Sequence, residues 1–336
     1  MSMATRDHPH LSLSQVSKTY EISRSGLMGK GRLLHAVSDV SLDVQRGETL
    51  GLVGESGCGK STLSRLMMHL EPPSAGTIRF DGRDLNAASG AELHAARRHF
   101  QMVFQDPYAS LNARMTARSI LAEPLRNYRY GAAKEIARRV EVTAGACGLS
   151  DYHLDKYPHE LSGGQCQRIG IARAIALEPA LIVADEPVSA LDVSIQAQIL
   201  NLLLQVQRDM GLTLVFVSHD LSVVAHIADR VAVMYLGRIV ELAPVHRLFA
   251  GGGHPYTRTL LAAVPRPVPG EKRQRASIQG ELPSPLNPPA GCHFRPRCPH
   301  AQERCLKERP ALRTLGSGHS VACHFAEDVL ALEGAA

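Results

Sequence analysis

The sequence contains no tryptophan, and aromatic residues make up only 4% of its 336 residues. Single-stranded nucleic acids are commonly bound by stacking their bases on aromatic side chains, so this scarcity argues against a nucleic-acid platform. No apolar run approaches the roughly 18 residues that a membrane-spanning helix requires. Residues 1–14 have no apolar core, so we expect no secretory signal. These absences predict a cytosolic protein that meets a membrane only through a partner.

A large excess of charge of either sign is also missing. Lys and Arg number 37 against 32 Asp and Glu, which gives a formal net charge of +5. This mildly basic balance permits contact with nucleotides or anionic head groups but is far from that of a protein that coats nucleic acid. With 44% hydrophobic and 21% charged residues the composition is ordinary for a globular protein, and the length suggests about two domains.

Short apolar segments alternate with segments of helical periodicity along most of the chain. Helical spacing is found in 61–70, 194–210 and 221–228. Such alternation predicts a parallel β-sheet covered by helices on both faces. Strand signals fade between 107 and 161, which predicts a helical insertion. The segments that we expect to form strands are 11–16, 37–44, 49–53, 77–80, 100–104, 181–184, 212–217 and 231–234.

A glycine-rich motif directly follows the strand expected at 49–53. It reads Gly54-Glu55-Ser56-Gly57-Cys58-Gly59-Lys60-Ser61 and fits the pattern G-x-x-x-x-G-K-[ST], with a helix expected after it. The glycines allow backbone N–H groups to turn inward around phosphate oxygens, and the helix N-terminus adds partial positive charge. We expect Lys60 to reach the β- and γ-phosphates and the Ser61 hydroxyl to ligate Mg²⁺. The motif therefore predicts a nucleoside triphosphate site.

Two adjacent carboxylates, Asp185 and Glu186, follow another apolar strand. Ligands of open α/β sheets bind at the carboxyl ends of the strands. We expect Asp185 to orient Mg²⁺ and Glu186 to act as the general base that polarises a water for in-line attack on the γ-phosphorus. The alternative for Glu186 is that it merely caps the next structural element.

The segment Leu161-Ser162-Gly163-Gly164-Gln165 has the composition of a second anion-binding helix start. Ser162 can cap a helix, and Gln165 stands three residues later, as in a capping box. The segment matches the signature of the ATP-binding cassette (ABC) ATPases, and with the two preceding motifs it makes the chain similar to that family. The resemblance implies an α/β P-loop NTPase core with an antiparallel β subdomain, a helical subdomain insertion and a small Cys-rich C-terminal extension.

Further residues match other motifs of that family. Gln105 resembles its Q-loop glutamine, His219 its switch histidine, and Ser189-Ala190-Leu191-Asp192 its D-loop. Tyr20 resembles the aromatic residue that stacks on adenine, with an ordinary edge-strand aromatic as the competing interpretation; for His219 the competing interpretation is a solvated loop histidine. The resemblance implies catalytic roles for Glu186, His219 and Gln105, and Mg²⁺ ligation by Ser61, Gln105 and Asp185. It implies ATP contacts from Tyr20, Gly54, Glu55, Ser56, Gly57, Cys58, Gly59, Lys60, Ser61, Thr62, Gln105, Ser162, Gly163, Gly164, Gln165, Asp185 and Asp192.

Motifs outside the ATPase core resemble those of bacterial dipeptide and oligopeptide importers. They are His254-Pro255-Tyr256-Thr257 and the segment 280–289. Among these importers, the chain looks closest to the subunit called F of the dipeptide importer, which is one of its two ATPase subunits. The resemblance implies a head-to-tail pair with a second, different ATPase subunit, two transmembrane permease subunits and a periplasmic peptide-binding protein, without nucleic acid. It also implies a peripheral position on the cytoplasmic face of the bacterial inner membrane. The alternatives are another solute, such as glutathione or a nickel complex, and a soluble ABC ATPase outside transport.

Four of the seven cysteines lie near the end of the chain, at Cys292, Cys298, Cys305 and Cys323. Four thiolates can hold an iron–sulfur cluster or Zn²⁺, and the short C-x2-C pairs typical of zinc sites are absent. Proteins that this chain resembles carry a [4Fe–4S] cluster in this extension, so the resemblance implies such a cluster. The alternatives are Zn²⁺ or reduced cysteines without a metal.

A proline-rich stretch separates this tail from the preceding sequence and predicts an extended linker. We therefore expect an ATPase domain over 1–263, with its helical subdomain at about 107–161. The linker is expected over 264–290 and the Cys-rich extension over 291–336.

Overall fold

The computed structural model describes residues 8–22, 31–264, 281–316 and 318–331. Most of the predicted linker, from residue 265 to residue 280, therefore lies outside the described residues. Within the described ranges, each helix is too short or too polar to cross a bilayer.

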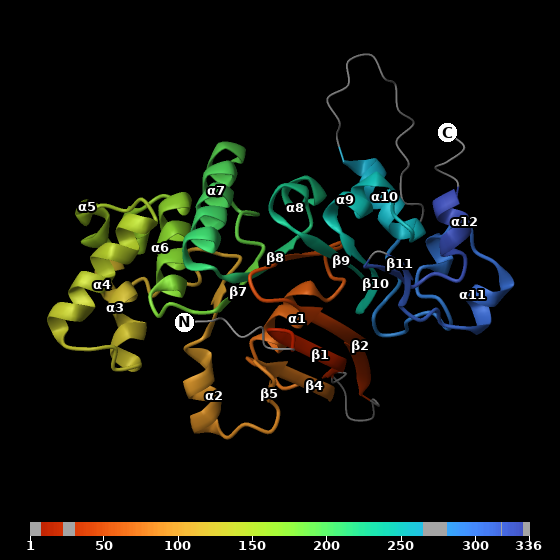
Figure 1. Cartoon of the computed structure of the whole chain (residues 1–336), viewed down its shortest axis with the longest axis horizontal. Helices are drawn as coiled ribbons and strands as arrows, with labels where there is room; N and C mark the ends of the chain where they lie inside the picture. Colours follow the sequence, from red (N-terminus) through yellow and green to blue (C-terminus); the bar gives the residue numbers. More distant parts are fainter. Residues whose placement is uncertain (1–7, 23–30, 265–280, 317, 332–336) are drawn as a thin grey trace, which may run out of the picture.

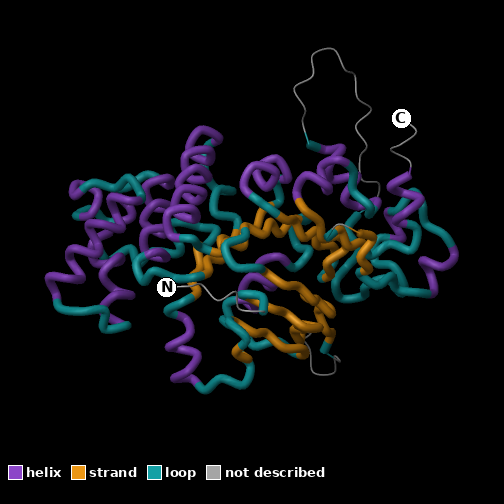
Figure 2. Tube along the Cα trace, viewed as in Figure 1, coloured by secondary structure: helices purple, strands orange, loops and turns teal. Residues whose placement is uncertain are grey.

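Two β-sheets form the frame of the molecule (Figures 1 and 2). The smaller sheet is antiparallel and has the order β2-β1-β4-β5, and the larger has the order β11-β12-β10-β9-β3-β8-β7-β6. In the larger sheet the five strands from β9 to β6 are parallel, and pairing becomes antiparallel at β10. The strands are β1 (Leu11–Ile22), β2 (Arg32–Val44), β3 (Thr49–Val53), β4 (Ala75–Phe80), β5 (Arg83–Asp84), β6 (Phe100–Val103), β7 (Leu181–Asp185), β8 (Thr213–Ser218), β9 (Arg230–Tyr235), β10 (Arg238–Pro244), β11 (Arg313–Gly316) and β12 (His319–Val321).

Helix α1 (Lys60–Met67) lies between the two sheets (Figure 1). Its Leu63, Leu66 and Met67 side chains are buried in one apolar cluster with Leu13 of the smaller sheet and Val215 of the larger. Burial of this face holds the helix in place, and because the helix begins at Lys60, its packing also fixes the end of the glycine-rich motif.

The opposite face of the larger sheet is covered by helices that include α6 (Gly163–Ile175), α7 (Val193–Met210) and α8 (Leu221–Ile227) (Figure 1). Along β7, Ile182 and Ala184 join the apolar cluster beneath these helices, whereas Leu181 and Val183 join the cluster around α1. Successive side chains of a strand point to opposite faces, so both faces of β7 are buried. The predicted sheet with helices on both faces is thus confirmed for its parallel part.

The segment predicted as a helical insertion contains three helices that gather with α6 at one end of the molecule (Figure 1). The helices are α2 (Gly90–Arg97), α3 (Ala117–Asn127), α4 (Ala133–Ala146), α5 (Asp151–Leu154), α6 (Gly163–Ile175), α7 (Val193–Met210), α8 (Leu221–Ile227), α9 (Val245–Ala250), α10 (Pro255–Ala263), α11 (Glu303–Lys307) and α12 (Ala326–Ala331), with short 3₁₀ turns at Pro158–Glu160 and Arg295–Arg297.

The C-terminal strands β11 and β12 extend the larger sheet through β10. A buried carboxylate on β10 helps to hold this junction, since Glu241 forms a 2.7 Å hydrogen bond with His319 Nε2 of β12. The same carboxylate accepts hydrogen bonds from the backbone N–H groups of Gly253 (2.8 Å) and His254 (2.9 Å). A buried charge needs such partners to offset its lost hydration. The described part of the tail is therefore packed into the main sheet, while the predicted domain boundaries stay a prediction.

Candidate nucleotide-binding site

The glycine-rich motif forms a tight loop between β3 and α1. Gly59 has φ +108°, and a Cβ atom built there would lie 2.3 Å from the carbonyl oxygen of Ala36 in β2. Both the backbone conformation and the space therefore require glycine. Lys60 is 4% exposed, and its Nζ donates hydrogen bonds to the carbonyl oxygens of Gly54 (2.8 Å) and Glu55 (3.1 Å). The ammonium thus lies across the loop whose N–H groups are expected to face phosphate.

A pocket of about 290 Å³ opens beside this loop. Its volume is close to the lower limit of the roughly 300–1,000 Å³ typical of small-molecule sites. Eight of its lining residues were predicted from the sequence to act in ATP binding or hydrolysis, namely Ser56, Gly57, Gly59, Lys60, Ser61, Thr62, Gln105 and Glu186. Leu34, Ala36 and Pro285 complete the lining and were not predicted for the site. No local motif marks Leu34 and Ala36, and Pro285 belongs to the segment 280–289, whose resemblance to importers indicates no role at the nucleotide.

Glu186 is the residue on which the predicted catalytic groups converge. Its Oε2 accepts a hydrogen bond from Gln105 Nε2 (3.1 Å) and lies 3.3 Å from His219 Nδ1. Its Oε1 lies 3.8 Å from Lys60 Nζ. These partners come from three separate segments of the chain, and each follows a strand of the larger sheet. Glu186 itself has φ +45°, a left-handed conformation that is uncommon for residues other than glycine and that recurs at functional sites.

Asp185 lies beside the start of α1. The Ser61 hydroxyl donates a 3.2 Å hydrogen bond to Asp185 Oδ1, so the two oxygens expected to surround Mg²⁺ are already neighbours. Burial raises the pKa of Asp185, opposed by the Ser61 hydrogen bond. Hydroxyl, carboxylate and amide oxygens are suitable ligands for Mg²⁺, and the donor types of Ser61, Asp185 and Gln105 fit that ion.

The predicted capping box at the start of α6 is present. Ser162 Oγ accepts a hydrogen bond from Gln165 N (3.3 Å), and Gln165 Oε1 accepts one from Ser162 N (2.9 Å). A Cβ on Gly164 would lie 2.6 Å from a side-chain carbon of Ile195, so close packing against α7 excludes a larger residue. Residues 162–165 do not line the pocket beside the P-loop, and their predicted contacts with ATP stay a prediction.

Tyr20 and Asp192, which were also predicted to contact the nucleotide, do not line that pocket either. Tyr20, in β1, donates a 2.5 Å hydrogen bond from its hydroxyl to Glu71, and Lys18 Nζ lies 5.2 Å from its ring centroid. Asp192 directly precedes α7 in an extended conformation. The adenine-stacking role of Tyr20 and the D-loop role of Asp192 stay predictions.

The C-terminal region holds the P-loop from outside the ATPase motifs. Arg297 forms a two-point ion pair with Glu55, with nitrogen–oxygen distances of 2.7 and 3.0 Å, and its side chain is only 5% exposed. The Tyr256 hydroxyl accepts a 2.8 Å hydrogen bond from the Glu55 backbone N–H. A bidentate guanidinium–carboxylate pair fixes orientation as well as distance. Both contacts escaped sequence reasoning, although the motif that contains Tyr256 was noted as a feature outside the core.

Arg297→Ala is therefore expected to weaken ATP binding by about tenfold, because Glu55 would lose the partner that fixes the loop. We expect kcat to change less than the KM for ATP. Arg297→Lys should restore only part of the affinity, since an ammonium cannot make the two-point pair. Steady-state ATPase kinetics check this, with Arg295→Ala as the matched control in the same turn. Equal KM values for Arg297→Ala and Arg295→Ala would contradict the role.

The four tail cysteines line one small pocket together with His300 and His324. The enclosed space is only about 20 Å³, room for roughly one water molecule. No three His, Cys, Asp or Glu side chains within the described ranges form a group that could hold a metal ion. Burial raises the pKa of Cys298 to about 12 and that of Cys323 to about 11 in the metal-free protein. The expected iron–sulfur cluster is thus not shown, although the four cysteines surround one pocket and their donor types suit such a cluster.

Comparisons with known proteins relate both parts of the chain to transporters. Residues 37–189 match the family described as ABC transporter, and residues 240–305 match the family described as oligopeptide/dipeptide transporter, C-terminal region. The probable peptide ABC transporter ATP-binding protein y4tS of Sinorhizobium fredii is 52% identical over 321 residues, which cover 94% of this chain and 89% of that protein. The oligopeptide transport ATP-binding protein OppF of Escherichia coli is 53% identical over 296 residues, which cover 87% and 88% of the two chains.

The fold is also similar to that of a solved ATP-binding cassette structure. The ATP-binding cassette MJ0796, as a dimer in a post-hydrolysis state bound to ADP and Pi, superposes with a TM-score of 0.63 and 31% sequence identity. The match covers 70% of this chain and 98% of that chain.

Proposed function

The chain belongs to the ABC transporter ATPases that carry the oligopeptide/dipeptide transporter C-terminal region, and from this premise we propose that it drives the uptake of dipeptides. It is the ATP-binding, ATP-hydrolysing subunit of a peptide importer. The single observation that carries the catalytic part is the meeting of Lys60, Gln105 and His219 at the Glu186 carboxylate. The proposal that the solute is a dipeptide rests on the resemblance of the tail and linker motifs to those of dipeptide importers.

We propose that Glu186 is the general base for hydrolysis. Its carboxylate can accept a proton from a water aligned with the γ-phosphorus, and Gln105 and His219 hold the carboxylate in that orientation. Lys60 neutralises charge on the β- and γ-phosphates, while the loop N–H groups bind their oxygens. Ser61, Asp185 and Gln105 would hold Mg²⁺, which supplies charge neutralisation at the phosphates.

We further propose that each ATP is enclosed by two ATPase subunits paired head to tail. Residues 162–165 would then contact the nucleotide bound to the partner's P-loop. In support, these residues begin a helix, lie outside this chain's own phosphate pocket, and have an exposed Ser162. The cassette MJ0796 was solved as a dimer with ADP and Pi. The partner that we propose is a second, different ATPase subunit, so that ATP binding favours the closed pair and hydrolysis releases it.

The proposed assembly includes two transmembrane permeases and a periplasmic peptide-binding protein. The chain would be attached peripherally to the cytoplasmic face of the inner membrane through the permeases. The helical segment α3 to α5, together with Gln105, is the proposed contact that transmits closure to them. Its exposed Tyr152 and Val142 provide apolar surface for such a contact.

Co-purification from membranes tests the proposed assembly. A tagged chain in its native host is expected to bring down two permeases and one different ATPase subunit, and its deletion should abolish growth on dipeptides as the sole source of a required amino acid. The deletion strain complemented with the Glu186→Gln variant should fail to grow on dipeptides. The same strain complemented with the Glu178→Gln control should grow. Recovery of the chain without permeases would overturn the transport role; unaffected dipeptide growth with loss of another solute would overturn only the solute.

We also propose that the four tail cysteines bind a [4Fe–4S] cluster. In support, Cys292, Cys298, Cys305 and Cys323 line a single pocket although they are spread over the tail sequence. Anaerobically purified protein is expected to contain about four iron and four sulfide per chain. Cys298→Ser should lose the iron, whereas Cys147→Ser, a buried cysteine in the helical segment, should retain it. One zinc per chain without iron, or no metal, would exclude the cluster.

A further inference from the structure

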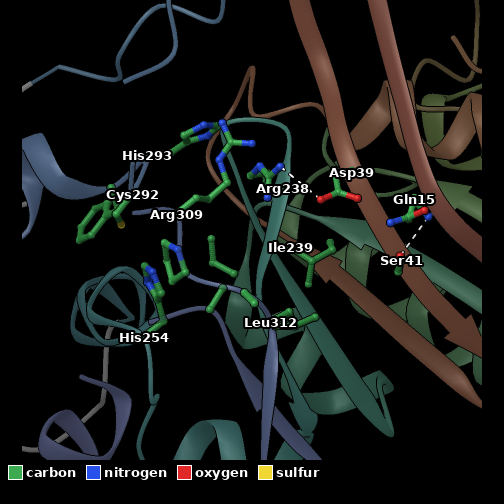
Figure 3. Close-up of a pocket in the computed structure, with 15 residues that line it drawn as sticks. Gln15, Asp39, Ser41, Arg238, Ile239, His254, Cys292, His293, Arg309 and Leu312 are labelled. Atoms are coloured by element: carbon green, nitrogen blue, oxygen red, sulfur yellow. Dashed lines mark hydrogen bonds and ion pairs between the residues drawn. The ribbon is translucent and has the colours of Figure 1, made fainter. Parts of the chain in front are cut away.

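A second cavity, separate from the phosphate pocket, lies where the C-terminal region meets the two sheets (Figure 3). Its volume is about 270 Å³. Gln15 comes from β1, Asp39 and Ser41 come from β2, residues 238–240 come from β10, and most of the remaining wall comes from the C-terminal region. Cavities of this kind at the junction of structural units are common places for small ligands. Nothing in the proposed ATPase mechanism uses this cavity.

Two guanidinium groups face this cavity. Arg238 reaches only one carboxylate, Asp39, at 3.5 Å, and its Nε is buried without a hydrogen-bond partner among the described residues. Arg309, in the loop between α11 and β11, makes no hydrogen bond or ion pair with any residue that the structure describes. Burial lowers the pKa of Arg238, and the nearby Arg309 charge lowers it further. Arg309 is exposed to solvent, which screens the repulsion between the two cations, and an anion bound between them would reduce it further.

A buried histidine completes the polar end of the cavity. His293 is 6% exposed, and neither of its ring nitrogens has a hydrogen-bond partner of ordinary geometry, although the Leu236 backbone lies near the ring. In Figure 3 its ring lies near the guanidinium of Arg309, with Arg238 between them and Asp39. Leaving a buried polar group unpaired costs about 1–3 kcal/mol. A ligand oxygen could accept a hydrogen bond from the N–H group of this ring and from the neighbouring guanidinium groups.

The other end of the cavity is apolar. Ile239, Leu312, Phe294 and Ala322 line it together with Pro310. Among the ionised side chains of the lining, two guanidiniums and the Asp39 carboxylate leave one net positive charge, which matches a monoanion better than a phosphate dianion. We propose that this cavity binds a small organic carboxylate, with its carboxylate against Arg238, Arg309 and His293 and its apolar body against Ile239 and Leu312.

The cavity lies close to the nucleotide site. The Gly237 N–H, next to Arg238, donates a 2.8 Å hydrogen bond to the carbonyl of Cys58 in the P-loop, and the Gly237 carbonyl accepts one of 2.8 Å from Ser38 N. Because the P-loop itself binds anions, a binding experiment must keep it occupied. Saturating MgADP serves that purpose.

Isothermal titration of the full chain with saturating MgADP tests the proposal, with N-acetyl-leucine, acetate and inorganic phosphate as probes. We expect N-acetyl-leucine to bind at least about tenfold more tightly than acetate or phosphate, and Arg309→Ala to weaken it at least about tenfold. Arg309 has no partner among the described residues, so that variant should fold normally, which a melting curve checks. Arg304→Ala is the matched control and should bind like the original chain, because Arg304 is exposed and its side chain pairs with Glu308.

Three results would overturn the proposal. They are no binding of any probe, equal N-acetyl-leucine affinity in the Arg309→Ala variant and the original chain, and phosphate binding more tightly than N-acetyl-leucine. Because these titrations measure neither hydrolysis nor transport, their outcome is independent of the proposed importer role.

Discussion

Glu186→Gln is expected to lower the ATPase kcat by at least about 100-fold while leaving ATP binding nearly unchanged. The amide keeps the size and hydrogen-bonding reach of the side chain, but it cannot take a proton from the attacking water. Gln105 and His219 would still meet a side-chain oxygen, so the pocket should keep its shape. Binding should persist because the phosphate contacts come from the P-loop and Lys60. The expected accumulated species is a closed, ATP-bound pair with the partner ATPase.

The Glu186→Gln experiment needs a control for the left-handed backbone conformation of Glu186. Glu178 also has a left-handed conformation, with φ +54°, and is an exposed residue that pairs with Arg139 at 2.9 Å. Glu178→Gln therefore repeats the same chemical change, on a similar backbone, away from the phosphate pocket. Single-turnover hydrolysis and equilibrium binding of ATP would be measured for both variants. Unchanged hydrolysis in Glu186→Gln would falsify its assignment as the base.

Lys60→Ala is expected to weaken ATP binding by at least about 100-fold, and hydrolysis should fall with it. The ammonium is the one cation predicted to reach the β- and γ-phosphates from the P-loop. It also bridges the carbonyl oxygens of Gly54 and Glu55, so its loss removes a brace from the loop. Finally, the Glu186 carboxylate would lose the cation that lies 3.8 Å away, which increases repulsion between that carboxylate and the γ-phosphate.

Binding of ATP to this variant would be measured by titration, with a melting curve to show that the chain is folded. Lys156→Ala is the control, because Lys156 is a partly exposed lysine in an i,i+4 pair with Glu160 and such pairs contribute little. If Lys60→Ala were folded and bound ATP as tightly as Lys156→Ala, the assignment of Lys60 to the phosphates would be wrong.

The strands that sequence analysis found are those with unbroken local patterns. The apolar run predicted at 49–53 is β3, with the same bounds, and the helix predicted at 194–210 is α7, which begins one residue earlier. The strand predicted at 11–16 in fact continues to Ile22. The sequence pattern does not show this extension, because register shifts along β1 interrupt the alternation of apolar and polar residues. In β10 the pattern is hidden by the charge of Glu241, which tertiary contacts bury.

The catalytic candidates likewise divide into residues that local motifs predict and residues that only tertiary contacts bring to the site. Motif spacing placed Lys60 at the start of a helix and Asp185 at the end of a strand, and the family resemblance added Gln105 and His219. No spacing in the sequence predicts that Arg297, more than 200 residues away, would pair with Glu55. Nor does it predict the shared pocket of Arg238 and Arg309.

The sequence by itself determined the P-loop, the strand that ends at Asp185 and the capping box at Ser162, because each depends on neighbours within a few residues. Only the tertiary structure decided which carboxylate meets Lys60, Gln105 and His219, and that the tail joins the main sheet and holds Glu55. The physical reason is that backbone conformation follows from local residue preferences, whereas ion pairs and cavities depend on where distant strands come to lie.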